Sequence, residues 1–220
     1  MFRLRIVLIF CFFAAASSIL TSCKKGDGDP FFSIYSRSAR LCGEWKISNY
    51  TQTVKSGNKA WITDINGDKK TYTTQVDTTM MVLVPAPHDT TFKMESKHTW
   101  TGSTEFTYVK DGTYDILENY KDDSTSMAWT AEEKGRWYFL SANKDSGFKN
   151  KELLGMQPVS YVYNPDAGSS SSTHYMGNSA SGVVEIYELK NKEIIFKTNT
   201  EETINSVVVS TTMEMTLLPR

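Results

Sequence analysis

The sequence predicts an all-β domain, an antiparallel meander that closes into a barrel of about 8–10 strands. Apolar and polar residues alternate over most of the chain after residue 41, which is the period of a half-buried strand. Asn66-Gly67 and Asp111-Gly112 lie between such segments and suit tight hairpin turns. Since successive hairpins place strands antiparallel to their neighbours, a sheet of this many strands is expected to close and bury its edges.

The first strand is expected to begin at residue 41. Trp45 and Ile47 share one face of this segment, and Gly43 is expected to permit a close approach of another chain segment. Residues 31–40, which carry several apolar side chains, are expected to dock as a short helix or an irregular lid.

The next elements are two strands around Asn66-Gly67, then a short buried strand at residues 80–84 that ends before Pro85. Residues 92–100 alternate as a half-buried antiparallel strand does. The face expected to be apolar carries Phe92, Met94, Ser96, His98 and Trp100.

Further hairpins fill the rest of the chain. Residues 106–116 form one around Asp111-Gly112, and residues 127–139 are expected to form another whose turn is residues 132–135. A strand at 159–163 is followed by a long loop at 167–181, interpreted as a plain loop in preference to a flap over a ligand. A hairpin at 183–197 and one closing strand at 204–217 complete the prediction.

The first 22 residues have the pattern of a secretory signal. Arg3 and Arg5 precede an apolar run at residues 6–16, which is shorter than the roughly 20 residues that a membrane-spanning helix needs. The run leads to Leu20-Thr21-Ser22-Cys23, which resembles the lipobox of bacterial lipoproteins. That resemblance implies cleavage between Ser22 and Cys23 and acylation of Cys23. The alternative is a secreted protein in which Cys23 is incidental.

The expected organisation is therefore a signal peptide (1–22), a lipidated cysteine with a flexible tether (23–40) and one barrel domain (41–220). Lys24 and Lys25 follow Cys23, where an Asp would favour the inner membrane, so an outer-membrane lipoprotein is expected. Whether it faces the periplasm or the cell surface is left open. The expected partners are the membrane through the anchor and, in addition, an envelope protein.

Charge and cysteine content narrow the function. The chain has 24 basic and 25 acidic residues and a net charge of −1, which disfavours nucleic-acid binding. Cys11 is lost with the signal and Cys23 is blocked by lipid, so Cys42 has no partner for a disulfide and is expected to be a buried small hydrophobe. One cysteine and three histidines do not predict a metal site, and no cofactor is expected.

Gly43-Glu44-Trp45, placed early in the first strand, is similar to the Gly-x-Trp motif of lipocalins. With the hairpins around residues 111 and 191, it resembles the lipocalin-like lipoproteins of Bacteroidota over residues 41–217. The resemblance implies that Trp45 closes the base of a barrel that holds a small hydrophobic ligand. A second lipocalin motif is missing, and no late arginine is placed to stack on Trp45.

Candidate ligand-binding residues are His98, Trp100 and Trp129, because aromatic side chains and one histidine on inward faces suit a pocket with few polar groups. The alternative is that His98 is a hydrogen-bonded core residue and that the tryptophans build the core. Residues 64–68 begin like a calcium loop, but the positions that need Gly and Glu hold Lys69 and Gln75, and residues 177–181 lack the second Gly of a nucleophile elbow. No enzymatic activity is expected.

Three Asp-Ser/Thr-Thr sequences resemble the O-glycosylation acceptors of Bacteroidota, with Thr78, Thr90 and Ser124 as acceptors. Two functions follow from the sequence. One is a lipid-anchored barrel that binds a small hydrophobic ligand. The other is a structural lipoprotein with a filled barrel that docks envelope proteins or glycans.

Overall fold

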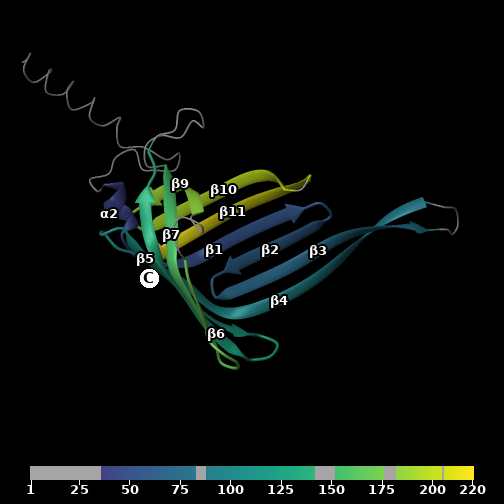
Figure 1. Ribbon diagram of the computed structural model, residues 1–220, viewed down its shortest axis with the longest axis horizontal. Helices are drawn as coiled ribbons and strands as arrows, with labels where there is room; N and C mark the ends of the chain where they lie inside the picture. The colour runs from purple at the N-terminus through teal and green to yellow at the C-terminus, as the bar shows by residue number, and fades with distance from the viewer. Residues whose placement is uncertain (1–35, 83–87, 142–151, 176–181, 205) are drawn as a thin grey trace, which may run out of the picture.

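The computed structural model describes residues 36–82, 88–141, 152–175, 182–204 and 206–220. For residues 79–82 and 88–92 it describes the backbone alone. One short helix, α2 (Arg37–Leu41), precedes the strands (Figure 1). The strands are β1 (Gly43–Ser56), β2 (Lys59–Asn66), β3 (Lys69–Val82), β4 (His88–Tyr108), β5 (Thr113–Asp122), β6 (Ala128–Phe139), β7 (Leu153–Pro165), β8 (Ser171–His174), β9 (Gly182–Lys190), β10 (Glu193–Ile204) and β11 (Val207–Pro219). In this part of the chain, no helix is both long and apolar enough to cross a membrane.

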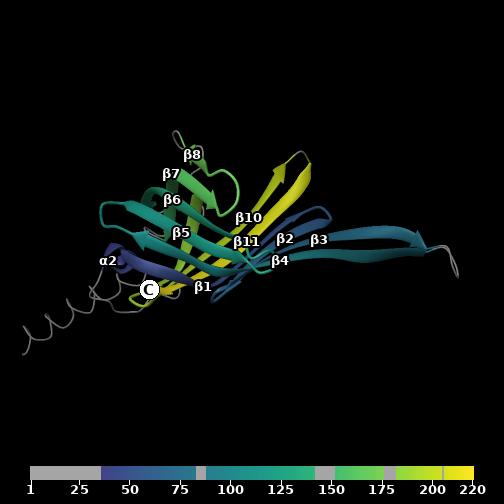
Figure 2. The ribbon, with the colours of Figure 1, turned by 90° about the horizontal axis from the view of Figure 1, so that it is seen from below.

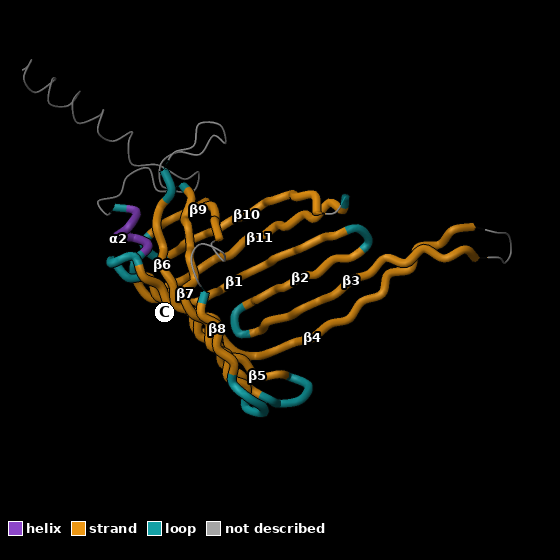
Figure 3. The backbone as a smooth tube through the Cα atoms, in the orientation of Figure 1, coloured by secondary structure: helices purple, strands orange, loops and turns teal. Residues whose placement is uncertain are grey.

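The strands form a closed antiparallel barrel, as the sequence predicts. The order is β6-β5-β4-β3-β2-β1-β11-β10-β9-β7, and the pairing of β6 with β7 closes the ring. β8 lies outside the ring and pairs only with the second half of β7 (Figure 3). Neighbouring strands in the ring follow one another along the chain except at three joins, β1 with β11, β9 with β7, and β1 with β4.

The join of β1 with β4 makes one end of the barrel narrow. Gly43–Lys46 of β1 pair directly with Glu105–Tyr108 of β4, which leaves β2 and β3 out of the ring at this level. Eight strands therefore surround the narrow end. An eight-stranded barrel is just wide enough for side chains to fill its interior.

The β2–β3 hairpin enters where β1 and β4 separate. Its turn lies in the fork: Gly67 N donates to Ser48 O at 2.8 Å, and Gly102 N donates to Asp68 O at 2.8 Å. Beyond the fork, β1 pairs with β2, β2 with β3 and β3 with β4. The barrel thus widens from eight strands to ten.

The narrow end holds the core and is closed by α2. Trp45 is 3% exposed, and its indole Nε1 donates to Leu41 O at 2.9 Å. Aromatic and aliphatic side chains from all sides pack around it: Leu41, Ile47, Phe106, Tyr108, Tyr114, Trp137, Leu154, Ile186, Leu189, Ile194, Phe196 and Leu217. Trp45 thus lies at the end of the barrel that α2 closes.

Two details at the base differ from expectation. Gly43 has a φ of +150°, which side-chain-bearing residues rarely adopt, and a Cβ there would make only ordinary contacts, so its role is conformational. Cys42 is half-buried at the edge of the core instead of fully buried, because it caps the end of α2, the helix that closes the narrow end. Burial raises the pKa of its thiol.

A long arm leaves the wide end (Figures 1 and 2). The ends of β3 and β4 pair only with each other here, from Asp77 opposite Lys93 to Val82 opposite His88. Residues 80–82 of the separate strand expected at 80–84 are instead the end of β3, and residues 83–84 lie outside the described chain. The expected half-buried face is wrong at Met94, which is 58% exposed, because β5 begins to pair with β4 only at Trp100 and no wall faces the arm.

The expected turn at residues 132–135 is wrong. β6 continues through it, and Glu133 pairs with Ile116 on one side and Tyr161 on the other. Gly135 is required here because a Cβ would lie 2.6 Å from Cε1 of Tyr114. A run of charged residues next to a glycine is typical of a turn, but in this strand Glu133 faces the barrel interior.

Two other elements also depart from prediction. Part of the expected loop at 167–181 is β8, which pairs with Ser160–Tyr163, while residues 176–181 lie outside the described chain. The expected closing strand at 204–217 is two strands, because β10 runs on to Ile204 and β11 starts at Val207. Ser206 makes this turn with a φ of +65°.

Candidate functional site

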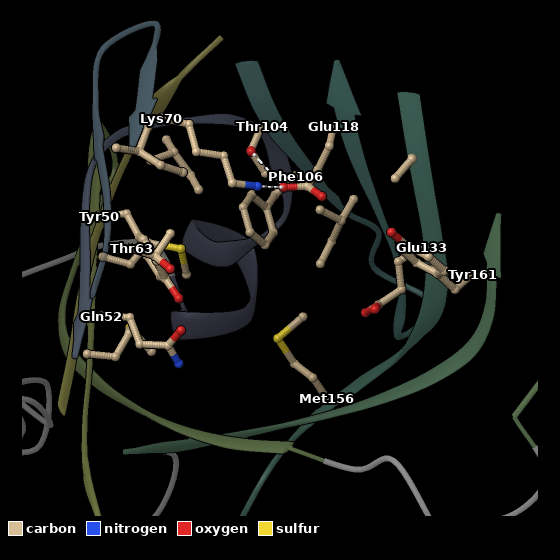
Figure 4. A pocket seen from close by; sticks show the side chains of 16 residues that line it. Tyr50, Gln52, Thr63, Lys70, Thr104, Phe106, Glu118, Glu133, Met156 and Tyr161 are labelled. Atoms are coloured by element: carbon tan, nitrogen blue, oxygen red, sulfur yellow. Dashed lines mark hydrogen bonds and ion pairs between the residues drawn. The ribbon is translucent and has the colours of Figure 1, made fainter. Parts of the chain in front are cut away.

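The wide half of the barrel contains a cavity of about 490 Å³, open at the mouth (Figure 4). Its floor is the top of the core, where Ile47, Phe106 and Met215 are buried. Its other lining residues come from eight strands: Tyr50, Gln52, Thr63, Ile65, Lys70, Thr104, Ile116, Glu118, Ala131, Glu133, Met156, Tyr161 and Met213.

Apolar side chains dominate the wall. Isoleucine, phenylalanine and methionine side chains of β1, β2, β4, β5, β7 and β11 face one another across the empty centre. Methionine is flexible and polarisable, so Met156, Met213 and Met215 can fit ligands of differing shape. The cavity therefore suits a body that is largely hydrocarbon.

An ion pair between β3 and β5 forms part of the cavity wall. Lys70 Nζ of β3 lies 2.9 Å from Glu118 Oε1 of β5, and the two side chains are 19% and 24% exposed. Thr104 Oγ1 donates to the same Glu118 oxygen at 3.3 Å (Figure 4). The ammonium also lies 4.7 Å from the ring centroid of Tyr120 and 5.2 Å from that of Trp129. Such a cation–π arrangement holds the Lys70 head at a fixed place.

The second carboxylate, Glu133, is held differently. Its Oε1 accepts a hydrogen bond from Tyr114 Oη at 2.7 Å, and it points into the cavity (Figure 4). No described cationic side chain lies within ion-pairing distance of it, whereas its neighbour Glu132 pairs with Lys134 at 2.9 Å.

Tyrosines around the cavity keep their protons well above neutral pH. Burial raises the pKa of Tyr50 to about 12, and the charge of Glu118 adds to the effect. Burial likewise raises the pKa of Tyr120 to about 12, against the opposing effect of its hydrogen bond with Thr104. Burial raises the pKa of Tyr161 as well, and the charge of Glu118 adds to the effect. These hydroxyls are neutral donors and acceptors at physiological pH.

The sequence-predicted residues Trp100 and Trp129 lie outside this cavity, at its rim. They line a second pocket of about 430 Å³ together with Asp122, Met127, Tyr163 and Pro165. Trp129 lies 5.3 Å from Tyr120 and 5.7 Å from Tyr163, measured between ring centroids. Lys70 connects the two pockets, since it pairs with Glu118 in one and approaches Trp129 of the other.

His98 lies above Trp100, with 4.4 Å between the ring centroids, and its Nε2 is hydrogen-bonded to Asp122 Oδ2. Its side chain is 44% exposed, so it belongs to the mouth instead of to the core. Asp122 also accepts from Ser124 Oγ, at 2.6 Å, and from the Ser124 and Thr125 amides. These hydrogen bonds hold the pKa of Asp122 far below its usual value.

The remaining predicted sites are distributed as follows. Gly43 and Trp45 lie at the base, where β1 pairs with β4 and α2 closes the barrel. Ser124 is exposed in the β5–β6 turn, and Thr78 is half-buried in the arm. The side chain of Thr90 and the lipobox residues Ser22 and Cys23 lie outside the described part of the chain.

Sequence reasoning missed the charged residues of the cavity and the two buried arginines of α2. Lys70 and Glu133 stand in runs of charged residues, and Glu118 is followed by Asn119, so the sequence does not distinguish them from solvent-facing charges. Arg37 and Arg40 are each 5% exposed, and their guanidinium groups donate to Ile186 O and Leu189 O of β9. An N-cap signal at Ser36, whose Oγ accepts from Ala39 N at 3.1 Å, marks this helix.

Comparison with known proteins adds little. No protein-family model matches the chain, and no curated protein matches it. Among solved structures, it is similar to Ail, the attachment invasion locus protein of Yersinia pestis, in complex with the heparin analogue sucrose octasulfate. The identity is 11%, the match covers 81% of this chain and 99% of Ail, and the TM-score is 0.20. At this TM-score the likeness supports no inference, and the fold assignment rests on the strand pairing of the barrel itself.

Proposed function

We propose that this protein is a lipid-anchored lipoprotein of the bacterial outer membrane whose barrel binds a small, largely apolar molecule. The observation that carries the binding is the contrast between a packed narrow end and an open cavity of about 490 Å³ lined by isoleucine, phenylalanine and methionine. Known small-molecule sites have volumes of roughly 300–1,000 Å³. The anchor rests on the lipobox sequence at residues 20–23 alone.

The lining favours binding over catalysis. The described residues of the cavity wall include no serine, cysteine or histidine, and the hydroxyl of Thr104 donates to a Glu118 oxygen that is already paired with Lys70. The described residues also hold no group of three or more His, Cys, Asp or Glu placed to bind a metal ion. Each carboxylate of the wall already accepts a hydrogen bond, from Lys70 or Tyr114.

Filling the cavity tests ligand binding. Ile116→Trp places an indole in the cavity from β5, while Leu117→Trp adds the same group on the outer face of the same strand, where Leu117 is exposed. Native mass spectrometry of the protein purified from its own membranes is expected to show a bound small molecule in the wild type and in Leu117→Trp. Ile116→Trp is expected to lack it. A wild-type protein without bound mass, and unable to take up an apolar dye, would contradict the proposal.

The anchor is tested separately. Cys23→Ala is expected to remove a lipid-derived mass increase from the mature chain and to release the protein from the membrane fraction. Intact-mass analysis of the same preparation also reports any sugar at Thr78, Thr90 or Ser124. A wild-type chain that begins at a residue other than Cys23, or carries no lipid, would overturn the anchor and leave the ligand proposal standing.

The arm favours a second function, docking of an envelope protein. Residues 77–82 and 88–93 form a two-stranded ribbon with no third strand beside it, which extends well past the barrel mouth (Figure 2). A ribbon with free edges offers backbone groups to a partner strand. Replacing residues 79–91 with a two-residue turn is expected to abolish co-purification of the partner while the cavity keeps its ligand. Unchanged co-purification would exclude the arm as the docking element.

A further inference from the structure

The charges of the cavity do not cancel. Lys70 and Glu118 neutralise each other across 2.9 Å, and Thr104 supports the pair. Glu133 is left with a neutral partner, the Tyr114 hydroxyl, and with no cation among the described side chains. The described interior therefore carries one uncompensated carboxylate.

The surroundings of Glu133 make this charge costly to leave alone. It stands in a row across three strands, between Ile116 and Tyr161, and Met156 and Ala131 line the same part of the cavity. An ionised carboxylate beside apolar surface is stabilised mainly by a counter-charge or by charge-assisted hydrogen bonds. One tyrosine hydroxyl supplies a single such bond and leaves the second oxygen facing the cavity.

Resting on the binding function proposed above, we propose that the ligand is an amphipathic cation: a single apolar chain or ring system with a protonated amine that pairs with Glu133. The apolar part lies against Met213, Met215 and Ile65, and the ammonium donates to the free oxygen of Glu133. A phosphate-bearing amine is disfavoured, because its anionic group would meet Glu118 and Glu133 in the same cavity.

The test uses the full chain in lipid nanodiscs, loaded with the neutral fluorescent probe N-phenylnaphthylamine. Decylamine, decanol and decanoate, which share one alkyl chain, compete for the probe. Decylamine is expected to displace it at about tenfold lower concentration than decanol, since hydrogen bonds to charged groups are stronger than neutral ones. Decanoate is expected to be the weakest. A lysophospholipid with an ethanolamine head is expected to compete less well than decylamine.

Two neighbouring carboxylates give a matched pair of variants. Glu133→Gln is expected to reduce the preference for decylamine over decanol to about twofold or less. Glu132→Gln makes the same change one residue away on the outer face, and is expected to leave the preference as in the wild type. Because all proteins are measured in the same nanodiscs, partition of the amine into lipid is common to all of them.

Lys70→Gln makes the cavity more negative, whereas Glu133→Gln makes it less negative. It leaves Glu118 without its cation, so the preference for decylamine is expected to rise above that of the wild type. Equal competition by decylamine and decanol in the wild type, or equal effects of Glu132→Gln and Glu133→Gln, would overturn the proposal while the binding function stands. Failure of the probe and of all three competitors to bind would overturn the binding function itself.

Discussion

The two halves of this barrel share eight strands, yet one half is filled with side chains and the other is hollow. At the narrow end, eight strands enclose tryptophan, tyrosine and leucine side chains that fill the interior. At the wide end, two more strands enter at the fork, and side chains of ordinary size no longer reach across. The difference shows that strand number, more than residue size, determines where this protein is solid and where it is hollow.

The narrow and wide ends of the barrel also differ in where their charged side chains lie. The narrow end keeps its polar atoms at its closure, where Arg37 and Arg40 of α2 donate to carbonyls of β9. The wide end places charged groups directly on the interior face, at Lys70, Glu118 and Glu133. A filled barrel has no room for such groups, while an open one can hydrate them or offer them to a ligand.

Truncation in the core is expected to give the largest effect. Phe196→Ala removes a fully buried ring at the narrow end and is expected to lower the free energy of unfolding by about 3–5 kcal/mol. Met213→Ala, in the cavity wall, removes a half-buried side chain beside existing empty space and is expected to cost about 1 kcal/mol or less. Urea unfolding measures both. Equal losses would contradict the distinction between a solid and a hollow half.

The fork is expected to be next in sensitivity. Gly102→Ala places a Cβ against the backbone oxygen of Asn119 and 2.7 Å from both Cα and Cδ1 of Tyr120, so the backbone of β5 leaves no room for it. The overlap is expected to cost about 1–3 kcal/mol of unfolding free energy. Gly182→Ala serves as the control, because nothing lies within 4 Å of its Cβ position. A neutral Gly102→Ala would mean that β4 and β5 are not held in close contact at the fork.

Alkaline pH is expected to weaken the barrel through its buried tyrosines. Tyr50 and Tyr120 have a pKa of about 12 in the folded state, above the 10.0 of a free tyrosine, so each favours folding while it stays protonated. Stability is therefore full below pH 10 and is lost between pH 10 and 12, by at most about 1.4 kcal/mol per pH unit for Tyr120. Urea midpoints in this window measure the loss, and Tyr120→Phe is expected to reduce it.

The smallest effect is expected at the outer surface. Lys69 pairs with Asp123 at 3.0 Å, but the two side chains are 54% and 35% exposed. Lys69→Gln is expected to change the unfolding free energy by about 0.5 kcal/mol or less. Its inward-facing neighbour Lys70 is the informative comparison, since Lys70→Gln also changes ligand selectivity. A change in selectivity with Lys69→Gln would show that the inner and outer faces are not independent.

Local signals in the sequence were sufficient for the closed half and for the tight turns. Asn66-Gly67 and Asp111-Gly112 form the predicted turns, with positive φ at both glycines, and Trp45 lies at the base as the Gly-x-Trp motif implies. These features depend on residues close in sequence. The barrel class followed from alternation alone.

The site was less predictable for a physical reason. Glu133 resembles a turn residue because charge inside a barrel is rare, so this inward-facing carboxylate caused the error in β6. Lys70 and Glu118 acquire their roles only from a contact between strands that are 48 residues apart. His98, Trp100 and Trp129 were predicted to bind the ligand from inward faces, yet none of them lines the main cavity: Trp100 and Trp129 line a second pocket at its rim, and His98 stacks beside Trp100.

The turn of the β2–β3 hairpin is bonded to the fork through one backbone hydrogen bond on each side, from Gly67 to Ser48 and from Gly102 to Asp68. Beyond this turn, β2 pairs along β1 and β3 pairs along β4. The base is assembled from Gly43–Lys46 and Glu105–Tyr108 without the hairpin. A longer or shorter β2–β3 hairpin would change the width of the open half of the barrel and leave the closed base unchanged. The hairpin is therefore the natural place to redesign which molecules the barrel admits.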